Sequence, residues 1–176
     1  KKAMAAALAV GMLASFVTGC GGGDKKAGDG KAASGQAEVF KFGVTNFADS
    51  LEPTDNYFGW VVLRYGLGEC LTKFDDKMNV QPWVADKWSV SDDKLTWTFH
   101  IRDNMVFSNG KKVDGEAVKK SFERVFEKSK RAGTFFTPTK MEAKGQDIII
   151  TTAEPMANLN GALADPLWLI VDVTSE

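Results

Sequence analysis

The chain of 176 residues is long enough for one modest domain. Its formal net charge of −1, without a large basic or acidic cluster, argues against nucleic acid as a partner. It contains a single histidine, no P-loop and no Gly-x-Ser-x-Gly motif, so no catalytic constellation is visible. We therefore predict a protein that is not an enzyme and that has neither a cofactor nor a resident metal.

The amino-terminal segment has the composition of a secretory signal. Residues 3–17 form an uncharged apolar run after Lys1 and Lys2, shorter than the about 20 residues that span a membrane but typical of a signal peptide. The run ends in Val17-Thr18-Gly19-Cys20, which resembles the lipobox of bacterial lipoproteins. That resemblance implies that residues 1–19 are a signal peptide and that Cys20 carries lipid. An ordinary secretory signal with an incidental cysteine is the alternative.

The segment after the signal is a predicted linker. Residues 21–36 contain no large apolar side chain and cannot form a core. We predict that residues 20–37 are the lipidated cysteine and a flexible tether, followed by a folded part, residues 38–176. With Cys20 lipidated, no intrachain disulfide is expected, and Cys70 lies in an apolar stretch typical of a small buried residue.

The first elements of the folded part are a strand, a helix and two short strands. Alternating apolar side chains predict a strand over residues 39–44. Residues 57–66 predict a helix that is apolar nearly all round, which is typical of a helix that is buried or lines a cleft. Residues 71–74 and 80–83 read as short strands on either side of a polar turn.

Two hairpins are predicted next. Residues 95–102 alternate apolar and polar side chains, and a polar turn at residues 91–94 joins them to a short strand at residues 88–90. A second hairpin is predicted around Asn109-Gly110, because this pair readily adopts the positive φ angles of a tight turn. His100 lies on the polar side of its strand, and we favour a surface or cross-strand role for it over metal binding.

A helix follows, with Asp114 as its expected N-cap. Its apolar side is formed by Val118, Phe122, Val125 and Phe126. Its charged side is expected to face water and consists of Lys119, Lys120, Glu123 and Arg124. Residues 139–143 and 148–152 predict another hairpin, and residues 159–163 a short helix before an apolar run. The class is therefore mixed α and β, with antiparallel hairpins beside a few helices.

The stretch from Pro82 to Arg124 resembles the family 5 extracellular solute-binding proteins, which are peptide and nickel receptors of ABC importers. The matching residues are Trp88, Val90, Ser91, Asp92, Asp93, Leu95 to Phe99, Ile101, Arg102, Val106, Phe107, Asn109, Gly110, Val118, Ser121, Phe122, Glu123 and Arg124. Two departures are small: Lys94 replaces a common glycine, and Glu116-Ala117 replaces a common Glu-Asp.

The resemblance implies an α+β fold like that of type II periplasmic binding proteins. A first-lobe strand and a small accessory α/β domain with antiparallel hairpins are expected, with the second lobe absent. Residues 38–176 are then a partial solute-binding domain, the N-terminal portion of a family member.

The function implied is that of a substrate-binding lipoprotein. It would capture an oligopeptide, a dipeptide or a nickel chelate outside the membrane and deliver it to the permease subunits of an ABC importer. Its lipid would hold it on the bacterial cell membrane, facing the periplasm or the cell exterior. A truncated surface lipoprotein, acting as a structural or interaction module without transport activity, is the alternative.

Five residues are candidates for ligand binding, on the resemblance and on their chemistry. Receptor clefts combine aromatic walls with a few polar groups, and arginine pairs with carboxylates in a two-pronged fork. The candidates are Tyr57, Trp60, Arg64, Arg131 and Trp168. The alternatives are core positions for both tryptophans, which we favour, a solvated helix end for Arg131, and a snorkelling side chain for Arg64.

Overall fold

The computed structural model describes Gly43 and residues 49–175. The expected signal peptide, the lipidated Cys20, the linker and the strand at residues 39–44 therefore lie outside the described residues, apart from Gly43. The helices and strands of the described part are α1 (Phe58–Arg64), β1 (Thr72–Phe74), β2 (Val80–Pro82), β3 (Ala85–Val90), β4 (Thr96–Ile101), α2 (Gly115–Lys128), β5 (Pro138–Lys144), β6 (Asp147–Thr152) and α3 (Leu159–Ala162). Three short 3₁₀ turns are η1 (Ala132–Thr134), η2 (Pro166–Trp168) and η3 (Val173–Ser175).

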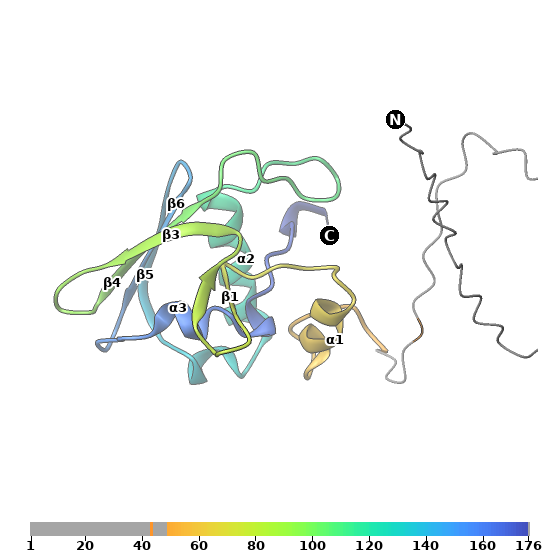
Figure 1. Ribbon diagram of the computed structural model, residues 1–176, viewed down its shortest axis with the longest axis horizontal. Coiled ribbons are helices and arrows are strands. Elements are labelled where there is room, and N and C mark those ends of the chain that lie inside the picture. Colours follow the sequence, from red (N-terminus) through yellow and green to blue (C-terminus); the bar gives the residue numbers. More distant parts are fainter. Residues whose placement is uncertain (1–42, 44–48, 176) are drawn as a thin grey trace, which may run out of the picture. The chain divides into compact units, whose positions relative to one another are not determined.

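A four-stranded antiparallel sheet organises this fold, in the order β3-β4-β6-β5 (Figure 1). Along β4 the side chains of Trp97, Phe99 and Ile101 are buried, while those between them are half-buried on the other face. The period-two prediction for this strand is confirmed, as are the two hairpins that join β3 to β4 and β5 to β6. His100 pairs across the sheet with Asp147, which confirms its expected cross-strand role.

Helix α2 covers the buried face of this sheet (Figure 1). Asp114 caps it as expected, because its Oδ1 accepts a hydrogen bond of 3.0 Å from the amide of Ala117. Val118, Phe122 and Val125 are buried in one core with Phe99 and with residues of β6. Arg124 is the exception to the predicted pattern: it is only 9% exposed and does not face water. The physical reason is a carboxylate from outside the helix, described below.

The second predicted hairpin, around Asn109-Gly110, is only partly right. Gly110 has the expected positive φ of 83°. The flanking residues form a single bridge, between Val106 and Lys112, and no strand. Polar side chains of this loop instead bind the segment at residues 172–175.

Helix α1 and the β1–β2 hairpin pack beside this core. Val62 of α1 is buried with Cys70 and Leu169 in a small cluster of their own. Cys70 is fully buried, as predicted, and burial raises the pKa of its thiol. Gly66, with φ of 69°, ends the turn after α1, so the helix is shorter than the ten residues predicted at 57–66. The described helices include none that is both long and apolar enough to cross a membrane.

Candidate functional site

The two sides of helix α1 differ in burial. Gly59 and Val62 face the protein, and Gly59 lies against the backbone of Pro166 in η2. On the other side Trp60 is 43% exposed, and Arg64, four residues later, is also exposed. The preferred interpretation of Trp60 as a core residue is therefore wrong. Small residues at the packed side of α1 leave its largest side chain to solvent.

Tyr57 and Arg131, two of the predicted candidates, are in direct contact. The Arg131 guanidinium lies 4.3 Å from the centre of the Tyr57 ring, and its Nη1 donates a hydrogen bond of 3.2 Å to the carbonyl of Asn56. Such stacking of a cation on an aromatic face is attractive. It orders the guanidinium, and among the described residues most of its five N–H donors have no acceptor, so they can serve an acceptor from outside.

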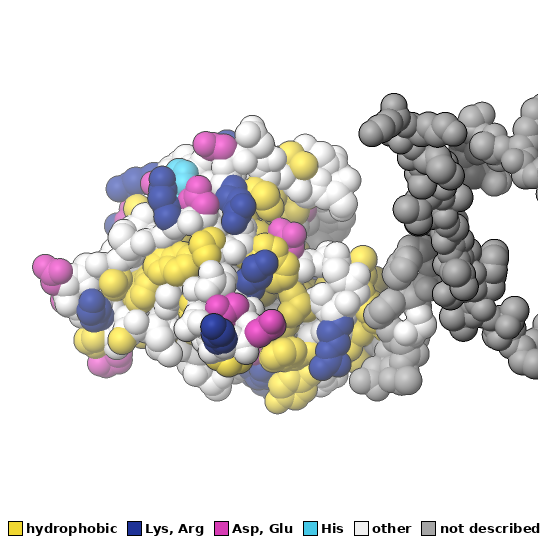
Figure 2. Space-filling view, in the orientation of Figure 1, with side chains coloured by type: hydrophobic (Ala, Val, Ile, Leu, Met, Phe, Trp, Pro, Cys, Tyr) yellow, Lys and Arg dark blue, Asp and Glu magenta, His cyan; other side chains and the backbone are white. Residues whose placement is uncertain are grey.

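Tyr57, Trp60, Arg64 and Arg131 are together called the α1 surface. Tyr57 precedes the helix and is 64% exposed. Residues three and four apart share one side of a helix, so Trp60 and Arg64 lie on the same side of α1. Among the described residues, no carboxylate lies within ion-pair distance of Arg64 or Arg131. Figure 2 shows hydrophobic side chains beside Lys or Arg side chains at the edge of the domain where α1 lies.

Trp168, the fifth candidate, lies inside the core. It is fully buried, and its ring packs against those of Phe122, Phe126, Phe135 and Phe136. Phe135 in turn lies 5.8 Å from the Arg131 guanidinium. Trp168 thus supports the α1 surface from within, in agreement with the core interpretation that the sequence favoured.

An ion pair between Glu52 and Arg124 was missed by the sequence reasoning. Nη1 of Arg124 donates to Oε1 of Glu52 at 3.0 Å, and Nη2 binds the second carboxylate oxygen, Oε2. The Arg124 guanidinium lowers the pKa of Glu52 to about 2, and hydrogen bonds from Thr54 add to this effect. No pattern could have indicated this pair, because its members lie 72 positions apart.

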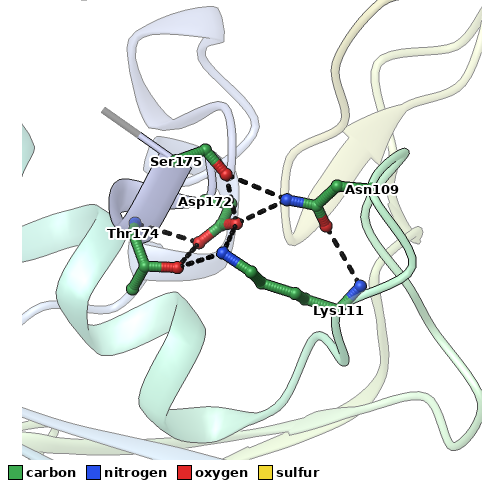
Figure 3. A network of polar contacts seen from close by, with 5 residues as sticks. All are labelled: Asn109, Lys111, Asp172, Thr174 and Ser175. Atoms are coloured by element: carbon green, nitrogen blue, oxygen red, sulfur yellow. Dashed lines mark hydrogen bonds and ion pairs between the residues drawn. The ribbon is translucent and has the colours of Figure 1, made fainter.

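A groove of about 510 Å³ lies apart from the α1 surface in the described part of the chain. Residues 66–69, 105–109 and 170–172 form most of its walls, and Leu67 and Val106 expose apolar side chains there. At its rim, Asp172 accepts hydrogen bonds from Asn109 at 2.7 Å and from Lys111 Nζ at 2.9 Å (Figure 3). Ser175 first, then Thr174, Lys111 and Asn109, lower the pKa of Asp172 by hydrogen bonding.

The groove and the α1 surface differ in their charged groups. At the groove the carboxylate of Asp172 and the ammonium of Lys111 already bind each other. On the α1 surface the partners of the Arg131 guanidinium are a carbonyl and two aromatic rings. Of these two arrangements, only the second has a positive charge without a carboxylate partner among the described residues, so we regard the α1 surface as the better candidate site for a ligand with a carboxylate.

Metal ligation has little support within the described ranges. They contain no group of three His, Cys, Asp or Glu side chains that could hold a metal ion. The Nδ1 of His100 lies 2.6 Å from Oδ1 of Asp147, in a pair that joins neighbouring strands.

The comparisons with known proteins agree with this architecture. The model of the bacterial extracellular solute-binding proteins, family 5 Middle, matches residues 79–173. This match covers more than half of the chain, so the chain belongs to the family 5 solute-binding proteins. The nickel ABC transporter from Bacillus halodurans is a structural neighbour with a TM-score of 0.68 and 35% identity, which covers 73% of this chain and 27% of its own.

Curated relatives include both nickel-binding and dipeptide-binding proteins. The nickel-binding periplasmic protein of Escherichia coli (strain K12) is 41% identical over 63 residues, 36% of this chain and 12% of that protein. The dipeptide-binding protein DppE of Bacillus subtilis (strain 168) is 30% identical over an alignment of 189 residues, which covers 100% of this chain and 34% of that protein. The chain thus spans a minor part of the length of both.

Proposed function

We propose that this chain is the N-terminal part of a substrate-binding lipoprotein of an ABC importer. The receptor captures an oligopeptide, a dipeptide or a nickel chelate outside the membrane and delivers it to the permease subunits. The observation that carries this proposal is the stacked Arg131–Tyr57 pair beside exposed Trp60 and Arg64, on a chain whose relatives bind nickel or dipeptides.

The chemistry of the α1 surface favours a small ligand with a carboxylate. A guanidinium fixed on an aromatic ring presents parallel N–H donors, which match the two oxygens of a carboxylate. Exposed aromatic rings supply apolar area around such a polar contact. A peptide carries this group at its C-terminus, and a chelate of nickel with an amino acid carries it as a metal ligand. The proposal therefore covers both cargo classes.

The location proposed is the outer side of the cell membrane. Cys20 carries lipid, and residues 20–37 act as the tether between the lipid and the folded part. Mass spectrometry of the mature protein tests this point directly: a diacylglyceryl group on an N-terminal Cys20 supports the anchor, and an unmodified cysteine in a longer or differently cleaved product contradicts it.

Cargo is identified on the receptor that contains this chain. Native mass spectrometry of the purified receptor, followed by calorimetry with nickel(II)–L-histidine and with a dipeptide, measures what it binds. Saturable binding of one probe supports the proposal. Failure of the receptor to retain any peptide or nickel species, and to bind either probe, contradicts it. The 176-residue chain alone is expected to bind weakly, because it spans only part of its relatives.

A further inference from the structure

The segment at residues 52–57, which leads into helix α1, is held at both ends by arginines. Arg124 of α2 binds the carboxylate of Glu52 at the start of this segment. Arg131, after α2, binds the carbonyl of Asn56 and covers the ring of Tyr57 at its end. The two arginines belong to neighbouring parts of the chain, so they form one support for the 52–57 segment.

Glu52 connects Arg124 to the beginning of helix α1 through hydrogen bonds. Its Oε1 accepts hydrogen bonds from the amide of Thr54, at 3.0 Å, and from the Thr54 hydroxyl, at 2.6 Å. Its main-chain carbonyl accepts one from the amide of Asp55, and the Asp55 carbonyl accepts one from Phe58. The first residue of α1 is therefore two hydrogen bonds away from the backbone of Glu52.

The geometry of the Glu52–Arg124 pair suits a fixing role. Two parallel contacts between a planar guanidinium and a carboxylate set direction as well as distance. The Arg124 side chain is only 9% exposed, whereas that of Glu52 is 25% exposed. A partly buried ion pair with two contacts contributes modest net stability, but it favours one relative orientation of its two side chains over others.

We propose that Glu52 and Arg124 are positioning residues for the α1 surface. Through the 52–57 segment they set the orientation in which Tyr57 and Trp60 are presented to the ligand, without contacting that ligand. The ligand-binding part of this inference rests on the proposed function, whereas the structural part, the ordering of the 52–57 segment, does not.

Hydrogen–deuterium exchange of the 176-residue chain tests the structural part. Glu52→Gln removes the charge with little change in shape, so faster exchange is expected in peptides covering residues 52–64 and unchanged exchange in β4 and β6. Glu116→Gln is the matched control, because Glu116 is an exposed carboxylate of α2 whose ion-pair partners within the described part of the chain are Lys119 and Lys120. Unchanged exchange over residues 52–64 in Glu52→Gln overturns the inference.

A second variant is needed if Glu52→Gln raises the exchange throughout the domain. Thr54→Ala removes a hydrogen bond to Glu52 and leaves both charges of the pair in place. A rise in exchange confined to residues 52–64 then supports the inference, and a rise that is absent or spread over the sheet overturns it.

Ligand affinity separates positioning from simple stabilisation. In the receptor, calorimetry with nickel(II)–L-histidine or a dipeptide is expected to give a roughly 2- to 30-fold weaker Kd for Arg124→Lys, at an unchanged enthalpy of unfolding for the sheet domain. Lysine keeps the positive charge of Arg124 but lacks the planar guanidinium that binds both carboxylate oxygens. Equal affinities for wild type and variant overturn the positioning role. If the wild type binds neither probe, the proposed function fails, while the exchange result still stands.

Discussion

The backbone of Gly59 lies so close to that of Pro166 that a Cβ at position 59 would be 2.4 Å from the Pro166 carbonyl oxygen. The contact brings helix α1 against η2 and turns Trp60 and Arg64 outward. The placement of the α1 surface thus depends on a residue without a side chain, on the side opposite to the proposed ligand contacts.

Gly59→Ala is therefore expected to destabilise the domain by about 1–3 kcal/mol, the usual range for overpacking. Backbone atoms cannot move aside as a flexible side chain can, so α1 must shift. Urea unfolding monitored by circular dichroism measures the effect. Gly133→Ala is the control, because a Cβ there would meet nothing within 4 Å. Equal stability of the two variants would show that α1 is not packed as described.

Lys94, in the turn between β3 and β4, adopts a positive φ of 60°. A side chain in this conformation costs roughly 1 kcal/mol, which glycine avoids. We predict that Lys94→Gly stabilises the domain by about 0.5–1 kcal/mol in urea unfolding. Ser89→Gly, in the regularly paired part of β3, is expected to destabilise it. A loss of stability in Lys94→Gly would contradict the argument.

Much of the fold could be predicted from the sequence, because its signals are local. The alternation of Trp97, Phe99 and Ile101 predicts β4, and Asp114 before an amphipathic run predicts α2. Gly110, in the predicted Asn-Gly turn, has the positive φ expected of it. Local periodicity and turn chemistry depend on neighbouring residues, and these neighbours are visible in one sequence.

The candidate site could be predicted only in part, because tertiary contacts decide burial. A charged residue on an amphipathic helix is normally solvated, so the sequence predicts that the Arg124 side chain faces solvent. Its partner, Glu52, comes from a loop that carries no periodic signal. The sequence favours a core position for Trp60 because tryptophan is highly buried on average, but Gly59 and Val62 occupy the packed side of the helix. By contrast, Tyr57 and Arg131 were both named from the sequence, and the fold brings them together.

Acid should weaken the contribution of Glu52 to stability. Its pKa is lowered from 4.5 to about 2 in the folded state, so this contribution is present above pH 4.5 and is lost as the pH falls toward 2. We expect the difference in unfolding free energy between wild type and Glu52→Gln to be constant at neutral pH and to shrink between pH 4.5 and 2. A difference that does not change with pH would rule out ionised Glu52 as its source.

The Asp172 network should protect the loop around Asn109-Gly110 from proteolysis. Asp172→Ala removes the acceptor shared by Asn109 and Lys111, so trypsin is expected to cleave after Lys111 and Lys112 faster than in wild type. Asp76→Ala, which changes an exposed carboxylate far from this loop in sequence, is the control. Identical cleavage rates at Lys111 in wild type and Asp172→Ala would show that the network does not restrain the loop.

The central claim, that the α1 surface binds a carboxylate-bearing ligand, is tested most directly by calorimetry on the receptor with Arg131→Ala. The probe is nickel(II)–L-histidine or a dipeptide, whichever the wild type binds. We predict that the variant binds it with a binding free energy weaker by about 1.5–3 kcal/mol, as for a lost hydrogen bond to a charged group. Lys130→Ala, an exposed neighbour of the same charge, should bind like wild type. An Arg131→Ala receptor with wild-type affinity would contradict the assignment of the α1 surface as the binding site.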